Sequence, residues 1–226
     1  YENNFLGPVT LRFALKESRN VPTVRLYDDL GSDKVLSFAA KFGFQTQNFP
    51  SNDLTVALGS RDVQPLEIVT GYSAIANGGY KVDPWFIREI SIDADGILYR
   101  ANPAVVCEDC NQQRDESDDE ITLAPRIVDE RVAYILNSML ESVITEGSGN
   151  RVYRELQRGD LRGKTGTTNG PQELWFSGFN KDIATTVFVG FDQPEPLGER
   201  EQGATVAVPI WIDFMREALR LSLIHI

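Results

Sequence analysis

The residues best suited to chemistry lie in one stretch, residues 159–179, whose centre reads Lys164-Thr165-Gly166-Thr167-Thr168. A cation, three hydroxyls and a glycine occur here within five residues. Threonine favours extended structure, and in a strand Lys164, Gly166 and Thr168 would share one face. A central glycine would let another molecule lie against the backbone. The stretch therefore predicts a strand that binds an anionic, peptide-like ligand along its edge.

Two alternatives apply to the same stretch. A phosphate-binding loop needs a glycine, four intervening residues, and then Gly-Lys-Ser/Thr. Only three residues separate Gly159 from Gly163, and no apolar strand precedes them. The spacing therefore argues against a nucleotide site, and we expect no cofactor. The second alternative is a polar edge strand with a solvated lysine, which the stretch by itself leaves open.

A second polar cluster, Ser18-Arg19-Asn20, follows a segment with an apolar face at residues 10–17. Thr10 could cap a helix there, and Pro22 suits the first turn of another helix. A loop held between two helices is a rigid mount for side chains that point into a cleft. We expect Ser18 and Asn20 to be presented in this way, with Arg19 facing solvent. A helix-end hydroxyl and a turn residue are the structural alternatives for Ser18 and Asn20.

The two clusters resemble the Ser-x-Asn and Lys-Thr-Gly elements of penicillin-binding proteins and serine β-lactamases. The continuation of the first element, Asn20-Val21-Pro22, is similar to the residues found at this position in class A penicillin-binding proteins. Other stretches resemble the same family in the same order: Val56-Ala57-Leu58-Gly59, Ala76-Asn77-Gly78-Gly79, Trp175-Phe176-Ser177-Gly178-Phe179, Val189-Gly190-Phe191-Asp192 and residues 209–215. Residues 1–221 are thus identified as part of the transpeptidase domain of a bifunctional class A penicillin-binding protein.

The resemblance implies D,D-transpeptidation through a serine acyl-enzyme, which cross-links peptidoglycan stem peptides and which β-lactams would acylate. It also implies a Ser-x-x-Lys motif before Ser18, yet the first 17 residues contain no serine. We therefore expect the nucleophile upstream of Tyr1, together with a glycosyltransferase domain and an inner-membrane anchor that leaves this domain in the periplasm. The alternatives are a D,D-carboxypeptidase or β-lactamase-like hydrolase, or an inactive binding or scaffolding domain.

By the same resemblance, Ser18 and Lys164 are the catalytic pair that passes a proton to the leaving D-Ala amine. Asn20 would bind the amide of the donor peptide. Thr165 and Thr167 would bind its carboxylate, and the backbone N–H of Thr167 would serve as an oxyanion donor. The expected substrate-binding set is Asn20, Thr165, Gly166, Thr167 and Thr168.

Length, net charge and the lengths of the apolar runs limit the kinds of partner that the chain could bind. A length of 226 residues suits one domain with a sizeable core. The formal charge of -11 argues against nucleic acid or an anionic membrane surface as a partner. No apolar run is long enough to span a bilayer, so membrane attachment would have to come from an upstream segment.

Helices and strands, recognised by the periodic spacing of their apolar residues, must position the two polar clusters. Helical spacing is found at residues 33–42, 64–76, 129–143 and 207–221, and strand patterns at residues 85–92, 97–100, 174–179 and 184–191. Helices that precede strands with hairpin-length links predict an α+β fold, an antiparallel sheet flanked by helices. The resemblance implies the five-stranded sheet of the β-lactamase/transpeptidase type. We expect Trp175 in the core, and residues 222–226 form a tail without an assigned role.

The segment 101–123 differs in character from the rest of the chain. Seven of the thirteen residues in 108–120 are acidic, opposed only by Arg114, which predicts a solvated insert and not a site. Cys107 lies just before this acidic run and Cys110 lies within it. The two cysteines form either a local disulfide or two free thiols. A structural zinc site would need four ligands, and the only histidine is His225, so we expect no metal.

Overall fold

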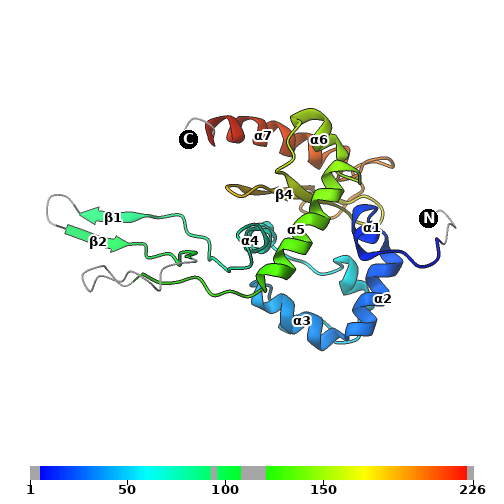
Figure 1. Ribbon diagram of the computed structural model, residues 1–226, viewed down its shortest axis with the longest axis horizontal. Helices are drawn as coiled ribbons and strands as arrows, with labels where there is room; N and C mark the ends of the chain where they lie inside the picture. The colour runs from blue at the N-terminus through cyan, green and yellow to red at the C-terminus, as the bar shows by residue number, and fades with distance from the viewer. Residues whose placement is uncertain (1–5, 93–95, 108–120, 223–226) are drawn as a thin grey trace.

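The computed structural model describes residues 6–92, 96–107 and 121–222 (Figure 1). Residues 93–95 between two predicted strands, the acidic run at 108–120 and the last four residues of the tail lie outside these ranges. The helices are α1 (Leu11–Lys16), α2 (Asn20–Leu30), α3 (Ser32–Lys41), α4 (Pro65–Ala76), α5 (Glu130–Thr145), α6 (Asn150–Leu156) and α7 (Ala207–Ser222), with short 3-10 turns at Thr46–Asn48 and Leu54–Leu58. The strands are β1 (Glu89–Ile92), β2 (Gly96–Arg100), β3 (Arg162–Thr167), β4 (Glu173–Phe179) and β5 (Ala184–Gly190).

The central sheet is antiparallel, with the strand order β3-β4-β5. Lys164 pairs with Ser177 and Gly166 with Trp175, which fixes the register of β3 against β4. Because side chains alternate along a strand, Trp175 lies on the face opposite Phe176. The α+β prediction is confirmed, and the described part of the chain contributes three strands to this sheet.

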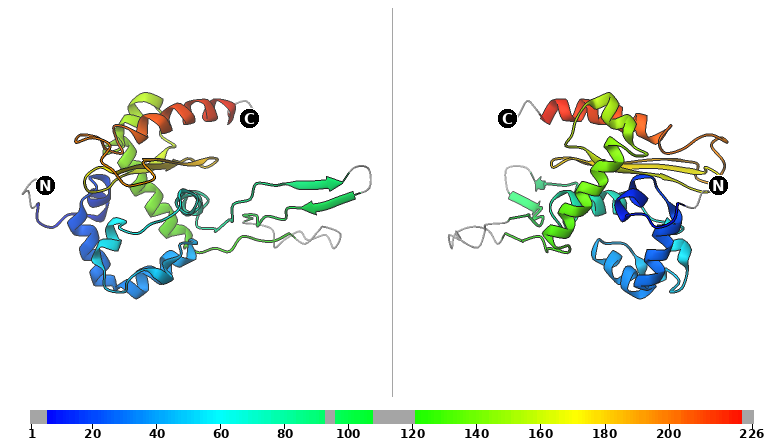
Figure 2. Two further views of the ribbon diagram at one scale, coloured as in Figure 1. Left: turned by 180° about the vertical axis from the view of Figure 1, so that it is seen from behind. Right: turned by 45° about the vertical axis from the view of Figure 1, so that its right-hand side comes forward.

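Helices cover both faces of this sheet. On one face Phe176 meets Trp211 of α7 edge to face, with ring centroids 5.1 Å apart. The indole N–H of Trp211 donates to the Thr185 carbonyl at 3.1 Å, so this buried polar group has a partner. On the other face Tyr72 of α4 lies 6.0 Å from Phe179 between ring centroids. Figure 2 shows α6 and α7 on one side of the sheet and α4 on the other, while α5 runs past the β3 edge and contacts α4, α6 and β3.

The core sits between the sheet and helix α7. Its fully buried residues come from several elements, and aromatic and branched side chains dominate it. The cluster consists of Ile144, Val152, Leu161, Phe176, Ala207, Val208, Trp211, Ile212, Met215 and Leu219. Burial of this kind supplies the main favourable term of folding and fixes the sheet against which the site is built.

Helices α1 and α4 begin at local capping interactions. Thr10 caps α1 by accepting from the Phe13 N–H at 3.2 Å, as predicted. The Glu67 carboxylate accepts from the Gln64 N–H at 2.8 Å at the start of α4. Helix α2 begins at Asn20, two residues before Pro22, because proline is also tolerated within a first helical turn. Helix α6 was not predicted, since Gly147-Ser148-Gly149 reads as a break and only seven residues follow it as a helix.

Strands β1 and β2 form a two-stranded arm that extends away from the helices and the central sheet (Figures 1 and 2). Their described residues are all exposed. Strand β1 starts at Glu89 and is shorter than the predicted 85–92 strand. The base of the acidic insert is closed, because Val105 pairs with Leu123 in a parallel bridge. Cys107 is disulfide-bonded, and Cys110 lies outside the described residues.

The prediction of a core position for Trp175 is wrong. Its indole is only half-buried and lies beside Phe188, with ring centroids 4.5 Å apart. Phe188 itself is 40% exposed. Trp175 shares its face of β4 with the buried Phe179, but Phe179 is covered by Tyr72 of α4, whereas Trp175 lies beside the partly exposed Phe188.

Candidate active site

Two sequence-predicted residues that lie 146 positions apart meet at the end of α1 and the middle of β3. The Lys164 Nζ donates to Ser18 Oγ at 2.8 Å and to the Thr165 carbonyl at 2.9 Å. Burial lowers the pKa of Lys164 to about 8. Near that pH the amine exists in both protonation states, so Lys164 can exchange a proton with a hydroxyl that it already contacts.

Ser18 adopts a backbone conformation that serines rarely take. Its φ is 52°, in the left-handed region. The Ser18 N–H donates to the Leu15 carbonyl at 3.2 Å, and the Arg19 N–H donates to the Ala14 carbonyl at 2.8 Å. This pair of bonds is the Schellman arrangement that ends a helix, in which glycine is the preferred residue at the position of Ser18. A strained residue at a helix end points to a requirement for the hydroxyl.

The two residues after Ser18 differ from expectation in different ways. Asn20 is the first residue of α2, not a loop residue, and its side chain is exposed. The expectation that Arg19 faces solvent is wrong. Arg19 is half-buried, and its Nε is buried without a hydrogen-bond partner among the described residues. The first turn of α2 therefore presents Asn20 outward and turns Arg19 inward.

The hydroxyls of Thr165 and Thr167 lie on the strand face opposite Lys164, by alternation along β3. Each has a partner from a distant part of the chain. Thr165 Oγ1 lies 2.8 Å from Ser148 Oγ. Thr167 Oγ1 accepts from the Gly203 N–H at 3.0 Å, which leaves its own hydroxyl proton available for donation.

Gly166 and Thr168 have local structural explanations. A side chain at Gly166 would place its Cβ 3.0 Å from the Cβ of Trp175, so the paired strand already fills that side. Strand β3 ends at Thr167, so Thr168 does not continue the face of Lys164 as predicted. The Thr168 hydroxyl accepts from the Glu173 N–H at 2.9 Å and closes the turn between β3 and β4.

The connection between α5 and α6 also reaches this site, a contact that no sequence pattern predicts. The Ser148 N–H donates to the Lys16 carbonyl at 3.2 Å, two residues before Ser18. A Cβ on Gly147 would lie 2.5 Å from the same carbonyl oxygen, so only glycine fits this close approach. By its residue types the stretch Gly147-Ser148-Gly149 predicts only a helix break, because no local pattern distinguishes a break from a contact between distant segments.

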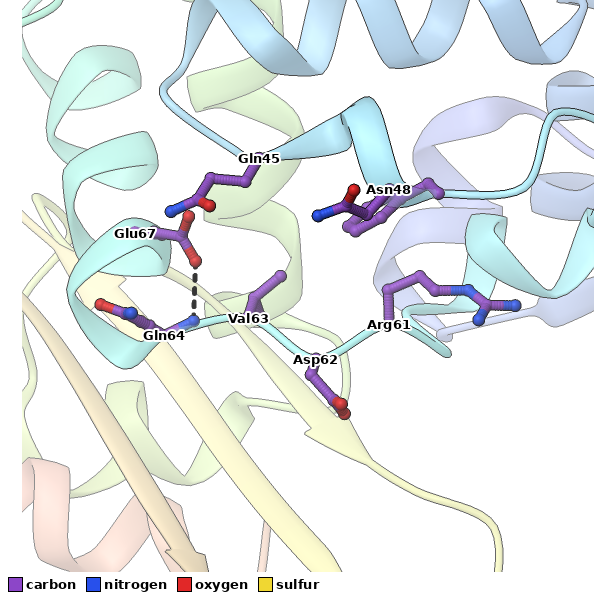
Figure 3. Close-up of a pocket in the computed structure, with 8 residues that line it drawn as sticks. Gln45, Asn48, Arg61, Asp62, Val63, Gln64 and Glu67 are labelled. Carbon is purple, nitrogen blue, oxygen red and sulfur yellow. Dashed lines mark hydrogen bonds between the residues drawn. The ribbon is translucent and has the colours of Figure 1, made fainter.

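A separate hollow of about 520 Å³ lies between residues 45–49 and 61–67 (Figure 3). Its lining includes none of the predicted site residues. The Gln64 N–H to Glu67 hydrogen bond that starts α4 forms part of its wall. This hollow therefore belongs to the packing of the α4 N-terminus and is separate from the Ser18–Lys164 contact.

Two kinds of site are absent from the described part of the chain. Within it, no group of three or more histidine, cysteine, aspartate or glutamate side chains could hold a metal ion. No described helix is long and apolar enough to cross a membrane.

Comparisons with known proteins agree with this architecture. The model of the penicillin-binding protein transpeptidase domain matches residues 1–216. The chain therefore belongs to the penicillin-binding protein transpeptidase family, as the resemblance indicated.

Individual relatives extend the comparison. Penicillin-binding protein 1A of Pseudomonas aeruginosa is 43% identical over 254 residues, a match that covers 99% of this chain and 31% of that protein. The crystal structure of penicillin-binding protein 1A from Haemophilus influenzae matches with a TM-score of 0.85 and 32% identity, over 96% of this chain and 35% of that one. The Mycobacterium tuberculosis PonA1 structure in complex with penicillin V shares the fold, with a TM-score of 0.75 and 19% identity over 96% and 58% of the two chains. The chain thus spans about a third of the length of its penicillin-binding protein 1A relatives.

Proposed function

We propose that this chain is the C-terminal part of a D,D-transpeptidase domain that cross-links peptidoglycan and is acylated by β-lactams. The observation that carries the proposal is the 2.8 Å contact between Lys164 Nζ and Ser18 Oγ, in a chain of the transpeptidase family. The donor is a stem peptide that ends in D-Ala-D-Ala, and the acceptor is an amine on a neighbouring stem. The penicillin V complex of the PonA1 neighbour supports a β-lactam as an alternative acyl donor.

The nucleophile in this proposal is a serine upstream of Tyr1. Its oxygen attacks the carbonyl carbon between the two D-Ala residues, and the C–N bond breaks. The departing amine needs a proton, which reaches it through the Ser18 hydroxyl. The acceptor amine then attacks the ester carbon and the C–O bond to the serine breaks. The proton that the amine loses passes to the departing serine oxygen, which leaves the cross-linking amide and a free serine hydroxyl.

Lys164 assists this transfer in two ways. A pKa of about 8 lets it give a proton to Ser18 and take one back near neutral pH. In its charged form it attracts the terminal carboxylate of the donor peptide. Asn20 binds the donor amide, the Thr165 and Thr167 hydroxyls bind the carboxylate, and Gly166 and Thr168 shape the strand and its turn. The Thr167 backbone N–H is one oxyanion donor, worth about 3 kcal/mol in the transition state.

The domain boundaries and the location follow the same proposal. Residues 1–221 form the partial transpeptidase domain, residues 101–123 form its acidic insert, and residues 222–226 have no assigned role. The parent protein places this domain at the periplasmic face of the inner membrane, with a glycosyltransferase domain and the anchor supplied upstream.

The test uses the complete parent protein, a D-Ala-D-Ala stem peptide and an acceptor amine, with products identified by mass spectrometry. Transpeptidation yields the cross-linked peptide and one equivalent of free D-Ala. Release of D-Ala with only a hydrolysed peptide would indicate the D,D-carboxypeptidase alternative. No release of D-Ala and no acylation by penicillin would indicate an inactive domain and contradict the proposal.

A further inference from the structure

The Ser148 hydroxyl bonds to a distant residue and not to the helix that follows it. Ser148 precedes α6, where serine often caps a helix, yet the cap position of α6 is Gly149, with no side-chain cap bond. In the described structure the Ser148 hydroxyl instead bonds to Thr165 Oγ1 at 2.8 Å, across 17 residues. The side chain is therefore directed at β3 and not at its own helix.

The same residue also holds the segment that carries Ser18. Its N–H donates to the Lys16 carbonyl at the last residue of α1. Next to it, the Glu146 carboxylate accepts from Lys16 Nζ at 3.1 Å, and Gly147 allows the two backbones to approach. Ser148 thus contacts both chain segments whose side chains meet in the Lys164–Ser18 hydrogen bond.

The number of hydroxyl protons determines which of the two residues, Ser148 or Thr165, is the donor in this contact. Two hydroxyls carry two protons, of which one lies between the oxygens and the other is free. An ionised carboxylate only accepts hydrogen bonds, so a carboxylate bound at Thr165 requires the Thr165 proton. Ser148 must then donate to Thr165 Oγ1. Thr165 in turn donates its own proton to the carboxylate, so the two hydroxyls form a chain of hydrogen bonds that ends at the ligand.

We propose that Ser148 is a positioning residue for carboxylate recognition, which orients the Thr165 hydroxyl toward the ligand and fixes the end of α1 beside it. This inference rests on the proposed function, because it assumes that a carboxylate binds at Thr165. Ser148 itself touches neither the ligand nor the reacting atoms.

The test measures acylation of the parent protein by a penicillin and by its methyl ester. Ser148→Ala should slow acylation by the free acid about tenfold, the effect of losing one neutral hydrogen bond. The methyl ester accepts only a weaker, uncharged hydrogen bond from Thr165, so its acylation should slow less, by no more than about twofold. Ser148→Thr keeps a hydroxyl and should restore the acid rate. Ser37→Ala, which removes a hydroxyl bonded to the Lys34 carbonyl of its own helix α3, is the matched control.

A double-mutant cycle adds a readout that a purely structural role would not produce. Thr165→Val removes the same hydroxyl contact and keeps the branched shape. Combined with Ser148→Ala, it should cost no more than Thr165→Val alone, because both changes remove one interaction. Ser148→Cys, which keeps the shape with a weaker donor, should give an intermediate rate and serves if the alanine variant does not fold.

The outcomes separate the two claims. An unacylated wild-type protein would contradict the proposed function and this inference with it. Normal wild-type acylation with an unchanged Ser148→Ala rate would overturn the inference alone. Equal losses for the acid and the ester would also overturn it, because they would show a general distortion of the site.

Discussion

At the scale of single residues, the protonation of Lys164 links the site to stability. Burial lowers its pKa to about 8 from a usual value of 10.5. Between these pH values the unfolded chain binds a proton that the folded chain does not, so the free energy of unfolding from this group rises with pH. Below pH 8 both states are protonated and the cost of burying the ammonium is present in full.

The corresponding prediction compares Lys164→Met with wild type by urea denaturation from pH 7 to pH 10.5. The variant should be the more stable protein at pH 7, and its advantage should shrink as the pH rises through 8. Lys181→Met controls for the change in net charge, since the Lys181 side chain is 84% exposed. A stability difference for Lys164→Met that is constant across this range would show that the lysine keeps its ordinary pKa.

The left-handed backbone at Ser18 gives a second prediction at this scale. Ser18→Gly and Ser18→Ala both remove the hydroxyl, and both should reduce acylation of the parent protein strongly. Glycine also relieves the strain, so Ser18→Gly should be about 1 kcal/mol more stable than Ser18→Ala. Thermal melts give the comparison. Equal stabilities would mean that the strain at Ser18 is negligible.

At the scale of elements, the ends of helices show how far the sequence could predict the structure. Thr10 was predicted as a cap and does cap α1, and the apolar spacing from residue 64 placed the start of α4 to within one residue. Ser18 breaks the local preference for glycine at a helix end, and Ser148 acts through a contact with another strand. Residues that serve distant partners are those for which local rules fail.

The connection after α4 gives a third prediction. Gly79 has a φ of 102°, and a Cβ there would lie within van der Waals radii of the Val128 carbonyl. The Gly79 carbonyl accepts from the Ile127 and Val128 N–H groups just before α5, so this point ties the end of α4 to the start of α5. Gly79→Ala should cost about 3 kcal/mol or more, from overpacking added to left-handed strain.

Its neighbour is the matched control. Gly78 has a φ of 82°, but a Cβ there would meet nothing within 4 Å. Gly78→Ala should therefore cost only the strain, about 1 kcal/mol. Chemical denaturation of both variants measures the difference. Similar losses for the two substitutions would show that the Val128 contact relaxes at little cost.

At the scale of the whole molecule, the combined resemblance of the separated motifs to one family indicated the function more specifically than either motif did alone. Neither Ser18-Arg19-Asn20 nor Lys164-Thr165-Gly166 is specific alone, yet the fold brings Ser18 and Lys164 into a hydrogen bond. The order of elements also predicted the antiparallel sheet with helices on it. The half-buried position of Trp175 and the extent of the two-stranded arm could not be predicted, because both depend on which neighbours cover a face.

The missing Ser-x-x-Lys motif gives a prediction at this scale. Residues 1–226 expressed alone should form no covalent adduct with a fluorescent penicillin, while the complete parent protein should be labelled. Gel fluorescence after denaturation distinguishes covalent from reversible binding. A stable labelled band from the isolated chain would place a nucleophile within these residues and require a different assignment of the site.

The most direct test of the central claim, that Lys164 handles protons at Ser18 in a transpeptidase, is the second-order rate of penicillin acylation by the parent protein. Lys164→Ala removes both the charge and the proton. Lys164→Arg keeps the charge but replaces the amine with a guanidinium that does not release its proton. Stopped-flow rates for both variants, with folding checked by thermal melts, should fall by at least about 100-fold. A rate near wild type for Lys164→Ala would contradict the account and leave Lys164 as a residue of a polar edge strand.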